Sequence, residues 1–322
     1  MNKTNYILIS ILTLILIKMI SAPAVCISYA LMGANLFFYK VFPSLFPFIV
    51  LCNLIISFNG IEIYSKLIGS IITKPFKISK RSSLVLIISL LCGYPLGAKY
   101  AAALYNNGEI DYPSYNKLVN IASNPSPFFV IVAVGLSMLH SLNYGYILIA
   151  SCYLSCIFMG LIINGKGKDI YFSGNNYKNN NIGEALGNSI NNGTTSCLLV
   201  LSYVIIFSII IGLIKSSKFI NTAFIFFSDI THIDKNIIFS IFSGIIEMTN
   251  GCSLVSNINC SIKYKLMMLS FILSFSSFSV ILQVNSFIYK TKFSIKKYIS
   301  RKFIQGLISC AITYIIFTIY SF

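Results

Sequence analysis

The chain has 322 residues, of which 56% are hydrophobic and 10% are charged, and its mean hydropathy is +0.81. Soluble domains carry about a quarter charged residues, so this composition excludes a soluble globule and predicts an all-α membrane protein with several spans. The net charge of +16 is compatible with nucleic acid, an anionic lipid surface or topology signals. The cysteines form no CxxC pair, which argues against a zinc site or a disulfide framework.

Membrane-spanning helices are predicted where about 20 mostly apolar residues run together. The run that opens the chain ends in Ser21-Ala22-Pro23-Ala24, which resembles a signal-peptide cleavage site, but Lys18 and the proline favour an uncleaved helix. Residues 24–42 mix polar and aromatic side chains, as is typical of a helix lying in the membrane interface. Seven segments qualify as full spans: 6–22, 43–58, 125–142, 144–164, 196–214, 266–288 and 303–321.

Two further apolar stretches, 82–104 and 237–260, are interrupted at their middles. The interruptions read Gly93-Tyr94-Pro95-Leu96-Gly97 and Glu247-Met248-Thr249-Asn250-Gly251. Glycine and proline destabilise a continuous helix, so each stretch is predicted to be a re-entrant hairpin that returns to the side from which it started.

The basic residues give a test of this topology. With a cytoplasmic N-terminus and two hairpins, sixteen of the 24 Lys and Arg residues fall inside and six outside, while Lys18 and Lys99 lie at membrane depth. This asymmetry follows the positive-inside rule, explains the net charge by topology and lipid contact, and argues against nucleic-acid binding. If both hairpins were full spans, the segments 105–124 and 165–183 would lie outside, and their basic residues would weaken the charge asymmetry. The distribution of basic residues therefore favours the hairpins.

The polar segment 165–183 divides the chain into two predicted halves. The first, 1–164, contains the hairpin 82–104, and the second, 184–322, contains the hairpin 237–260 and the C-terminal span. Each half offers an apolar span, a broken hairpin and a span with polar residues early in its course. The first hairpin would enter from the cytoplasm and the second from outside, which predicts an inverted repeat with a central transport site.

Glu247 is the one acidic residue within an apolar segment. Burying its carboxylate costs at least ~2.5 kcal/mol on insertion scales, so it requires a partner, a proton or water. The functional interpretation is that Glu247, with Asn250 beside it and Gly251 allowing the break, holds a coupling H⁺ or Na⁺ or contacts a substrate. The alternative is an ion pair with Lys99 that only joins the hairpins.

Lys99 follows the first interruption, where the second arm of the hairpin would begin. A helix N-terminus beside an ammonium group makes an anion site. Gly93, Pro95 and Gly97 would allow the break, and Tyr94 could hydrogen-bond to a planar ligand or stack on it. Alternatively, Lys99 extends to the cytoplasmic face and Tyr94 has no functional role.

The motif Asn124-Pro125-Ser126-Pro127 opens the span 125–142. Its prolines leave the carbonyl groups of residues 121–123 without helical donors, and such carbonyls bind cations or substrate donors. Asn124 and Ser126 could equally serve as caps of an ordinary helix start with proline at its first position.

A polar stripe in the second half either lines a pathway or joins helices through serine contacts; it comprises Ser274, Ser276, Ser277, Ser279 and Gln283. The sequence contains no phosphate loop, no metal-ligand cluster and no nucleophile with a base at matched depth. We therefore expect no enzyme, no catalytic residue and no bound metal cofactor.

These motifs resemble the sporulation integral membrane protein YlbJ family of the nucleoside-recognition or gate-domain superfamily. Relatives more often carry Asn-Asn-x-Gly-Pro where this chain has its Asn-Pro-Ser-Pro motif. The segments that carry the resemblance lie in both halves: Phe42-Pro43-Ser44-Leu45-Phe46-Pro47-Phe48, Leu91-Cys92-Gly93-Tyr94-Pro95-Leu96-Gly97-Ala98-Lys99, Asn124-Pro125-Ser126-Pro127-Phe128 and Gly244-Ile245-Ile246-Glu247-Met248-Thr249-Asn250-Gly251.

The resemblance implies a protein of endospore formers that moves dipicolinate, a small planar dianion, across the outer forespore membrane. The superfamily is similar to concentrative nucleoside carriers, which is compatible with inverted hairpins. We expect a secondary transporter with a small organic anion between its halves, in contact with the lipid bilayer and able to form a homo-oligomer or to bind other spore membrane proteins. The alternatives are a nucleoside-type carrier and a non-transporting scaffold for spore-envelope assembly.

Overall fold

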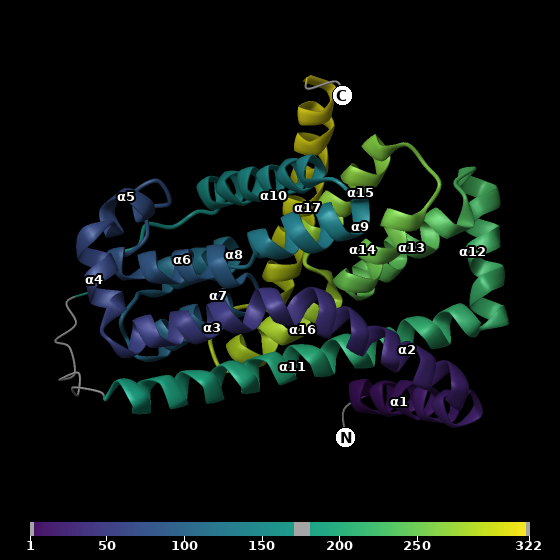
Figure 1. Cartoon of the computed structure of the whole chain (residues 1–322), viewed down its shortest axis with the longest axis horizontal. Helices are drawn as coiled ribbons and strands as arrows, with labels where there is room; N and C mark the ends of the chain where they lie inside the picture. Colours follow the sequence, from purple (N-terminus) through teal and green to yellow (C-terminus); the bar gives the residue numbers. More distant parts are fainter. Residues whose placement is uncertain (1–2, 171–180, 320–322) are drawn as a thin grey trace.

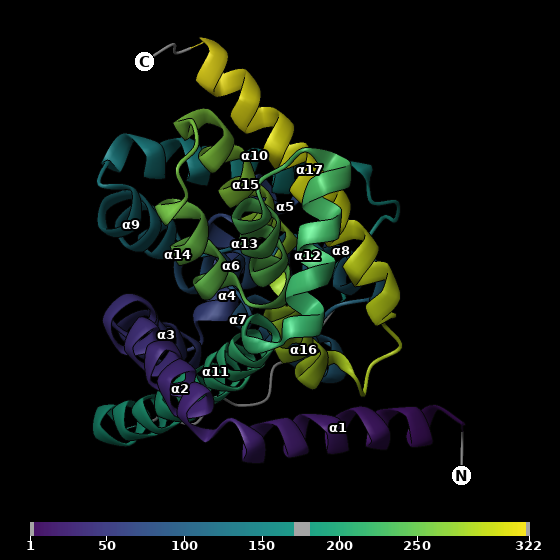
Figure 2. The same ribbon diagram turned by 90° about the vertical axis from the view of Figure 1, so that its right-hand side faces the viewer.

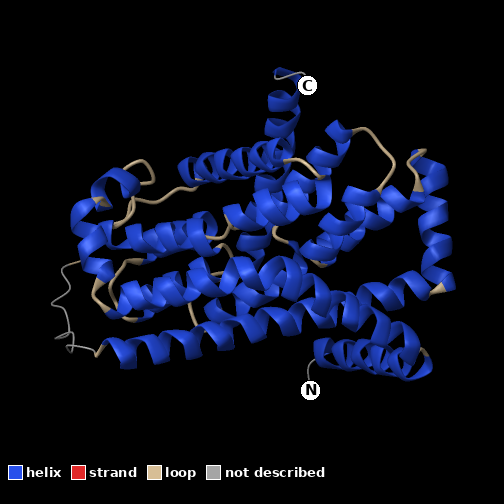
Figure 3. Ribbon diagram, in the orientation of Figure 1, coloured by secondary structure: helices blue, strands red, loops and turns tan. Residues whose placement is uncertain are grey.

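The computed structural model describes residues 3–170 and 181–319, and 84% of it is helical with no strand in these ranges (Figure 3). The prediction of an all-α fold is confirmed. The helices in chain order are α1 (Lys3–Ser21), α2 (Pro23–Leu36), η1 (Phe37–Val41), α3 (Phe42–Ser57), α4 (Gly60–Leu67), α5 (Gly69–Thr73), η2 (Lys80–Ser82), α6 (Ser83–Cys92), α7 (Leu96–Asn106), α8 (Tyr112–Ile121), η3 (Phe129–Leu136), α9 (Ser137–Leu139), α10 (Leu142–Ile162), α11 (Ile182–Ser216), α12 (Lys218–Thr231), α13 (Lys235–Ile246), α14 (Met248–Asn257), α15 (Ile262–Phe275), α16 (Ser277–Ile288) and α17 (Ile295–Ile319).

Among the described residues, five helical segments are long and apolar enough to cross a membrane. A sixth candidate is the pair Leu45–Ser57 and Gly60–Leu67, which is bent by 86°. The predicted count of seven full spans is therefore not confirmed. The five segments are Pro23–Val41, Leu142–Ile162, Ile182–Ser216, Ile262–Ile288 and Ile295–Ile319.

The segment 24–42, predicted to lie in the interface, instead forms most of the candidate span Pro23–Val41 and packs against α11. One of its aromatic residues, Tyr29, packs against that helix. A Cβ added to Gly212 of α11 would lie 2.4 Å from the ring of Tyr29, and one added to Gly33 would lie 2.5 Å from Ser208 Oγ. Small residues thus allow the two helices to approach closely.

The predicted span 125–142 is also different in the structure. Its apolar helix covers only Phe129–Leu139, which is too short for a full span. Proline at positions 125 and 127 delays the helix start, because proline disfavours helical conformation in the residue before it. At the other end His140 adopts a left-handed conformation with φ 57°, which ends the helix.

Both interruptions in the apolar stretches are helix breaks. The pairs α6–α7 and α13–α14 each fold back on themselves, with the two arms in contact. A Cβ added to Gly251 would lie 2.0 Å from the Cα of Gly244, so the arms of α13–α14 touch through glycine backbone. The re-entrant path of these pairs and the inverted repeat remain predictions.

A second kind of break follows each hairpin. After α8 the chain is non-helical from residue 123 to 126, and the span 266–288, predicted to be continuous, is interrupted at Ser276. Ser276 and Ser277 have φ angles of 76° and 54°, a left-handed conformation that is uncommon for serine. Each half therefore contributes one broken hairpin and one broken helix to the interior.

The long helix α11 runs along one long edge of the molecule, and α10 lies on the opposite edge (Figure 1). The helices that carry the breaks lie between these edges, and α1 extends below the other helices (Figure 2). Large apolar side chains of α1, from Tyr6 to Ile20, are mostly exposed. Such a surface suits contact with lipid.

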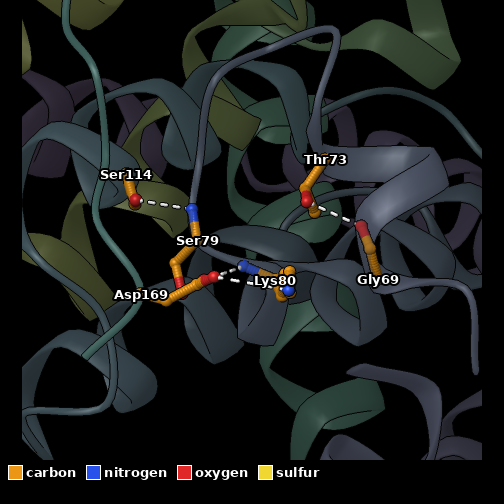
Figure 4. Close-up of polar contacts among 6 residues, drawn as sticks. All are labelled: Gly69, Thr73, Ser79, Lys80, Ser114 and Asp169. Carbon is orange, nitrogen blue, oxygen red and sulfur yellow. Dashed lines mark hydrogen bonds and ion pairs between the residues drawn. The ribbon is translucent and has the colours of Figure 1, made fainter. Parts of the chain in front are cut away.

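The polar segment after α10 is tied to the body of the protein by hydrogen bonds (Figure 4). Lys80 N donates to Asp169 Oδ1 at 2.7 Å, and Lys168 N donates to Oδ2 of Asp111, the N-cap residue of α8, at 2.8 Å. The start of the predicted loop 165–183 is thus fixed between η2 and α8. Positions 171–180 lie outside the described residues, and the predicted division into halves stays a prediction.

Candidate functional site

The break of the first hairpin is shaped by contact with the break that follows α8. Gly93 has φ 75°, and a Cβ added there would lie 2.6 Å from Ser126 N. Tyr94 N donates to the carbonyl oxygen of Asn124 at 2.8 Å. A Cβ added to Gly97 would lie 1.7 Å from the carbonyl oxygen of Ala122. Glycine is required at positions 93 and 97 because the backbone of the second break occupies that space.

The side chain of Tyr94 joins the two halves of the molecule. It is 8% exposed, and its hydroxyl contacts Met248 Sδ and lies 3.4 Å from the carbonyl oxygen of Leu273. Met248 begins α14, and Leu273 lies just before the break between α15 and α16. The tip of the first hairpin therefore meets both breaks of the second half. Pro95 precedes α7 as its N-cap residue.

Glu247 separates α13 from α14 and caps the N-terminus of α14. Its carboxylate accepts hydrogen bonds from Thr249 N at 3.1 Å and Asn250 N at 2.7 Å, and from Asn250 Nδ2 at 2.7 Å. These bonds satisfy backbone donors that a helix start leaves free, and the helix dipole stabilises the negative charge. Glu247 is 1% exposed, so the break holds a carboxylate inside the protein.

Asn250 extends this arrangement to α11. Its Nδ2 donates to Ser208 Oγ at 2.7 Å as well as to the carboxylate. Its Oδ1 is buried and has no hydrogen-bond partner among residues 3–170 and 181–319. The same is true of Gln283 Oε1 on α16. Both amide oxygens can therefore accept hydrogen bonds from a ligand or from water.

A central cavity lies where three of the breaks meet beside α16. We define it by Tyr94, Ser126, Glu247 and Gln283, the four predicted site residues that line it. The rest of its wall is mainly apolar and comes from η1, α3, η3, α11 and α16. Its volume is about 50 Å³, enough for a few water molecules. Glu247 is the only ionisable acid or base in the lining that the structure describes, apart from the Tyr94 phenol and the Cys92 thiol.

The structure does not bring Lys99 into this cavity. Its Nζ donates to Ser196 Oγ on α11 at 3.2 Å and lies 5.9 Å from the centre of the Phe287 ring. Neither Lys99 nor Glu247 forms an ion pair within the described residues. The ion pair considered as the alternative role of Glu247 is therefore not formed.

The remaining predicted site residues lie around the cavity without lining it. Ser277 is fully buried, and its hydroxyl lies 3.1 Å from that of Ser279. Gly251 lets the arms of the second hairpin touch. Asn124 turns its side chain away: its Nδ2 donates to the carbonyl oxygen of Ile121 at 2.8 Å and to Cys156 Sγ at 3.0 Å.

A buried cluster that the sequence patterns did not predict lies at the break between α8 and η3. Lys302 of α17 is fully buried, and its ammonium donates to the carbonyl oxygen of Ser123 and, at 3.0 Å, to Gln305 Oε1. Gln305 Nε2 donates to Asn124 Oδ1 at 2.7 Å. The predicted span began at residue 303, which placed Lys302 in a loop. The spacing of Lys302 and Gln305 on one helical face was the available signal.

No family model matches the chain. The chain is 26% identical over 336 residues to the sporulation integral membrane protein YlbJ of Bacillus subtilis (strain 168), and the match covers 95% of this chain and 81% of the relative. The resemblance to the YlbJ family is confirmed. The YlbJ relative and the apolar helices show an integral membrane protein, as expected.

The fold is also similar to a solved structure. A doubly substituted CNTnw, a nucleoside transporter, in an outward-facing state superimposes with a TM-score of 0.51 at 13% identity, over 93% of this chain and 84% of that chain. At this identity the likeness concerns the fold alone.

Proposed function

We propose that the chain is a secondary transporter that binds a small organic anion at the central cavity, and that this anion is dipicolinate. The observation that carries the proposal is the meeting of three helix breaks from both halves at one cavity, where Tyr94, Ser126 and Glu247 join Gln283 of α16 in the lining. Interrupted helices that meet in the interior are characteristic of transporter binding sites. The choice of dipicolinate follows from what the resemblance of the sequence motifs implies, and the similarity to YlbJ supports a role in sporulation.

The carboxylate of Glu247 makes cation coupling a physical requirement for such a substrate. A carboxylate and an organic anion repel each other strongly in a buried site, where the effective dielectric constant is low. Both fit only when a cation neutralises Glu247. An H⁺ or Na⁺ taken up with the substrate would supply this neutralisation, and its gradient would drive transport.

A neutral nucleoside is the second candidate substrate. Gln283 Oε1 is a buried acceptor in the cavity wall that could bind an N–H or O–H donor of such a molecule. The described cavity lining contains no Lys or Arg. A nucleoside would bind beside Glu247 without a compensating cation.

Uptake into proteoliposomes tests the proposal. Purified protein would be reconstituted and supplied with labelled dipicolinate or labelled uridine under an H⁺ gradient, a Na⁺ gradient or no gradient. We expect saturable dipicolinate uptake that depends on one gradient and is reduced roughly tenfold in Glu247→Gln. The matched control Glu184→Gln, at an exposed position of α11, should transport normally.

Three outcomes would contradict the proposal. Gradient-independent uridine uptake with no dipicolinate uptake would favour the nucleoside carrier. Absence of any uptake by folded protein would favour the scaffold. Normal dipicolinate uptake by Glu247→Gln would remove the carboxylate from the mechanism.

The cellular location is part of the same proposal. We place the chain in the outer forespore membrane with its N-terminus in the cytoplasm, which the charge asymmetry and the similarity to YlbJ support. Fluorescent fusions in sporulating cells should surround the forespore. A reporter protein that is active only in the cytoplasm should be active when it is joined to the N-terminus. Activity of a reporter that works only outside the cytoplasm would contradict the orientation.

A further inference from the structure

Lys302 is a buried cation that the proposed transport mechanism does not use. It is 0% exposed and lies within α17, one of the five candidate spans. Its ammonium donates to the carbonyl oxygen of Ser123 and to Gln305 Oε1, and Gln305 in turn donates to Asn124 Oδ1. The cluster thus connects the last span to the segment between α8 and η3.

A buried ammonium ordinarily pairs with a carboxylate, because removing its charge from water is costly. The ion pairs within residues 3–170 and 181–319 join Lys66 to Glu62, Lys80 to Asp169 and Arg81 to Glu109, and none involves Lys302. The charge is stabilised by neutral oxygens instead. One of them, Ser123 O, lies just beyond the C-terminus of α8, where the helix dipole is negative.

Such a group of oxygens is what a helix break offers to a free cation. Unwound carbonyls and the C-terminal ends of half-helices coordinate coupling cations in transporters. At this break the prolines at positions 125 and 127 cannot donate hydrogen bonds, so the carbonyl oxygen of Ser123 is left for another donor. The ammonium of Lys302 fills that position.

We infer that Lys302 is a tethered cation, which occupies the break between α8 and η3 in place of a free coupling cation. The position matters for the central cavity because the same segment supports the first hairpin through the bond from Tyr94 N to Asn124 O. A covalently held ammonium keeps this support in place without Na⁺. The coupling cation then has to be the one on Glu247, and a proton is sufficient there.

Thermal unfolding of purified protein tests the inference without a transport assay. Lys302→Ala removes the ammonium and leaves space for a hydrated cation beside Ser123 O and Gln305 Oε1. The variant should unfold at a lower temperature than wild type in choline chloride, and Na⁺ should raise its midpoint saturably and by more than it raises that of wild type. Lys302→Met fills the space without charge and should not respond to Na⁺, whereas Lys302→Arg should keep wild-type behaviour.

The inference is overturned if Na⁺ affects wild type and Lys302→Ala equally, or if the alanine variant is as stable as wild type in choline chloride. It is also overturned if the alanine variant cannot be purified folded in either salt, because Na⁺ should replace the lost ammonium. Recovery of folded variant only in NaCl supports it.

Measurement of dipicolinate uptake gives a second test of the inference, which rests on the proposed function. Dipicolinate uptake by Lys302→Ala should be roughly tenfold higher in NaCl than in choline chloride, and wild-type uptake should be nearly the same in both. An equal salt response in both proteins would contradict the inference. Absence of uptake in wild type would refute the proposed function alone, since the unfolding experiment does not depend on substrate.

Discussion

The helix breaks in the two halves of the molecule are stabilised by opposite charges. In the second half the carboxylate of Glu247 receives the backbone N–H groups at the start of α14. At the break of the first half the ammonium of Lys302, supplied by α17 of the second half, donates to a carbonyl group just beyond the end of α8. Each charge complements the helix end that it contacts, because the N-terminus of a helix is positive and the C-terminus is negative.

The comparison shows why one charge is suited to coupling and the other to support. Glu247 lines the central cavity, where a small ion or a substrate can reach it. Lys302 is absent from the described lining and is held by Ser123 and by Gln305, which is itself bound to Asn124. The break in the first half is thus held by a permanent cation that α17 of the second half supplies, whereas the break in the second half holds an anion that can be neutralised.

The largest expected effect comes from separating the arms of the second hairpin. In Gly251→Val the added Cβ would meet the backbone of Gly244 at 2.0 Å, so α13 and α14 must move apart. We expect a loss of about 3 kcal/mol or more in unfolding free energy, at the upper end of overpacking effects. Gly187→Val on α11 is the matched control, because nothing lies within 4 Å of its Cβ. Equal thermal midpoints for the two variants would show that the hairpin arms do not touch.

The next largest effect is expected at the break between α8 and η3, where Lys302 binds. Lys302→Met leaves Ser123 O and Gln305 Oε1 without their donor, and each lost partner of a buried polar group costs about 1–3 kcal/mol. We expect destabilisation of about 2–4 kcal/mol by chemical denaturation. The control is Lys297→Met, at an exposed position of the same helix, which should change stability by less than ~0.5 kcal/mol. A similar result for both variants would assign Lys302 no role in the break.

Glu247→Gln should destabilise the second half by less. The amide oxygen of glutamine can still accept from Thr249 N or Asn250 N, but the charge at the helix N-terminus is lost, which costs about 0.3–1 kcal/mol at such a position and up to ~2 kcal/mol when it is buried. Thermal unfolding of this variant should therefore show a smaller shift than Lys302→Met. A larger shift than that of Lys302→Met would contradict the assignment of Lys302, rather than Glu247, as the charge that mainly stabilises the structure.

The smallest effect is expected for Lys99→Gln. The structure places this ammonium against Ser196 and outside the central cavity, and its side chain is only half-buried. Loss of this hydrogen bond should cost about 1 kcal/mol at most, and dipicolinate uptake should keep the wild-type KM. A rise in KM of tenfold or more would restore Lys99 as the anion-binding residue.

The sequence was sufficient to locate the hairpin breaks. Gly93 and Gly97 flank a proline in an apolar run, and Glu247 is a charge in another, so each signal is local and strong. The sequence also placed Tyr94, Ser126 and Gln283 at interior positions, and the structure brings all three to the cavity.

Other features depend on contacts that no local pattern contains. The burial of Lys302 requires α17 to lie against Ser123, 179 residues earlier in the chain. The left-handed conformation of Ser276 could not be predicted, because the position carries neither glycine nor asparagine, the residues that usually adopt it. The tyrosine and asparagine residues of 24–42 suggested an interfacial helix, but the contact of Tyr29 with Gly212 of α11, within the candidate span Pro23–Val41, could not be read from this pattern.

Proton movement during dipicolinate uptake tests the central claim most directly. Proteoliposomes with a pH-sensitive dye outside would receive dipicolinate in choline chloride, without an imposed gradient. We predict that wild-type protein makes the outside medium more alkaline as the substrate enters, because Glu247 takes up a proton with each anion, and that Glu247→Gln produces no such signal. Uptake of dipicolinate by wild type without proton movement, or an unchanged signal in Glu247→Gln, would contradict the account.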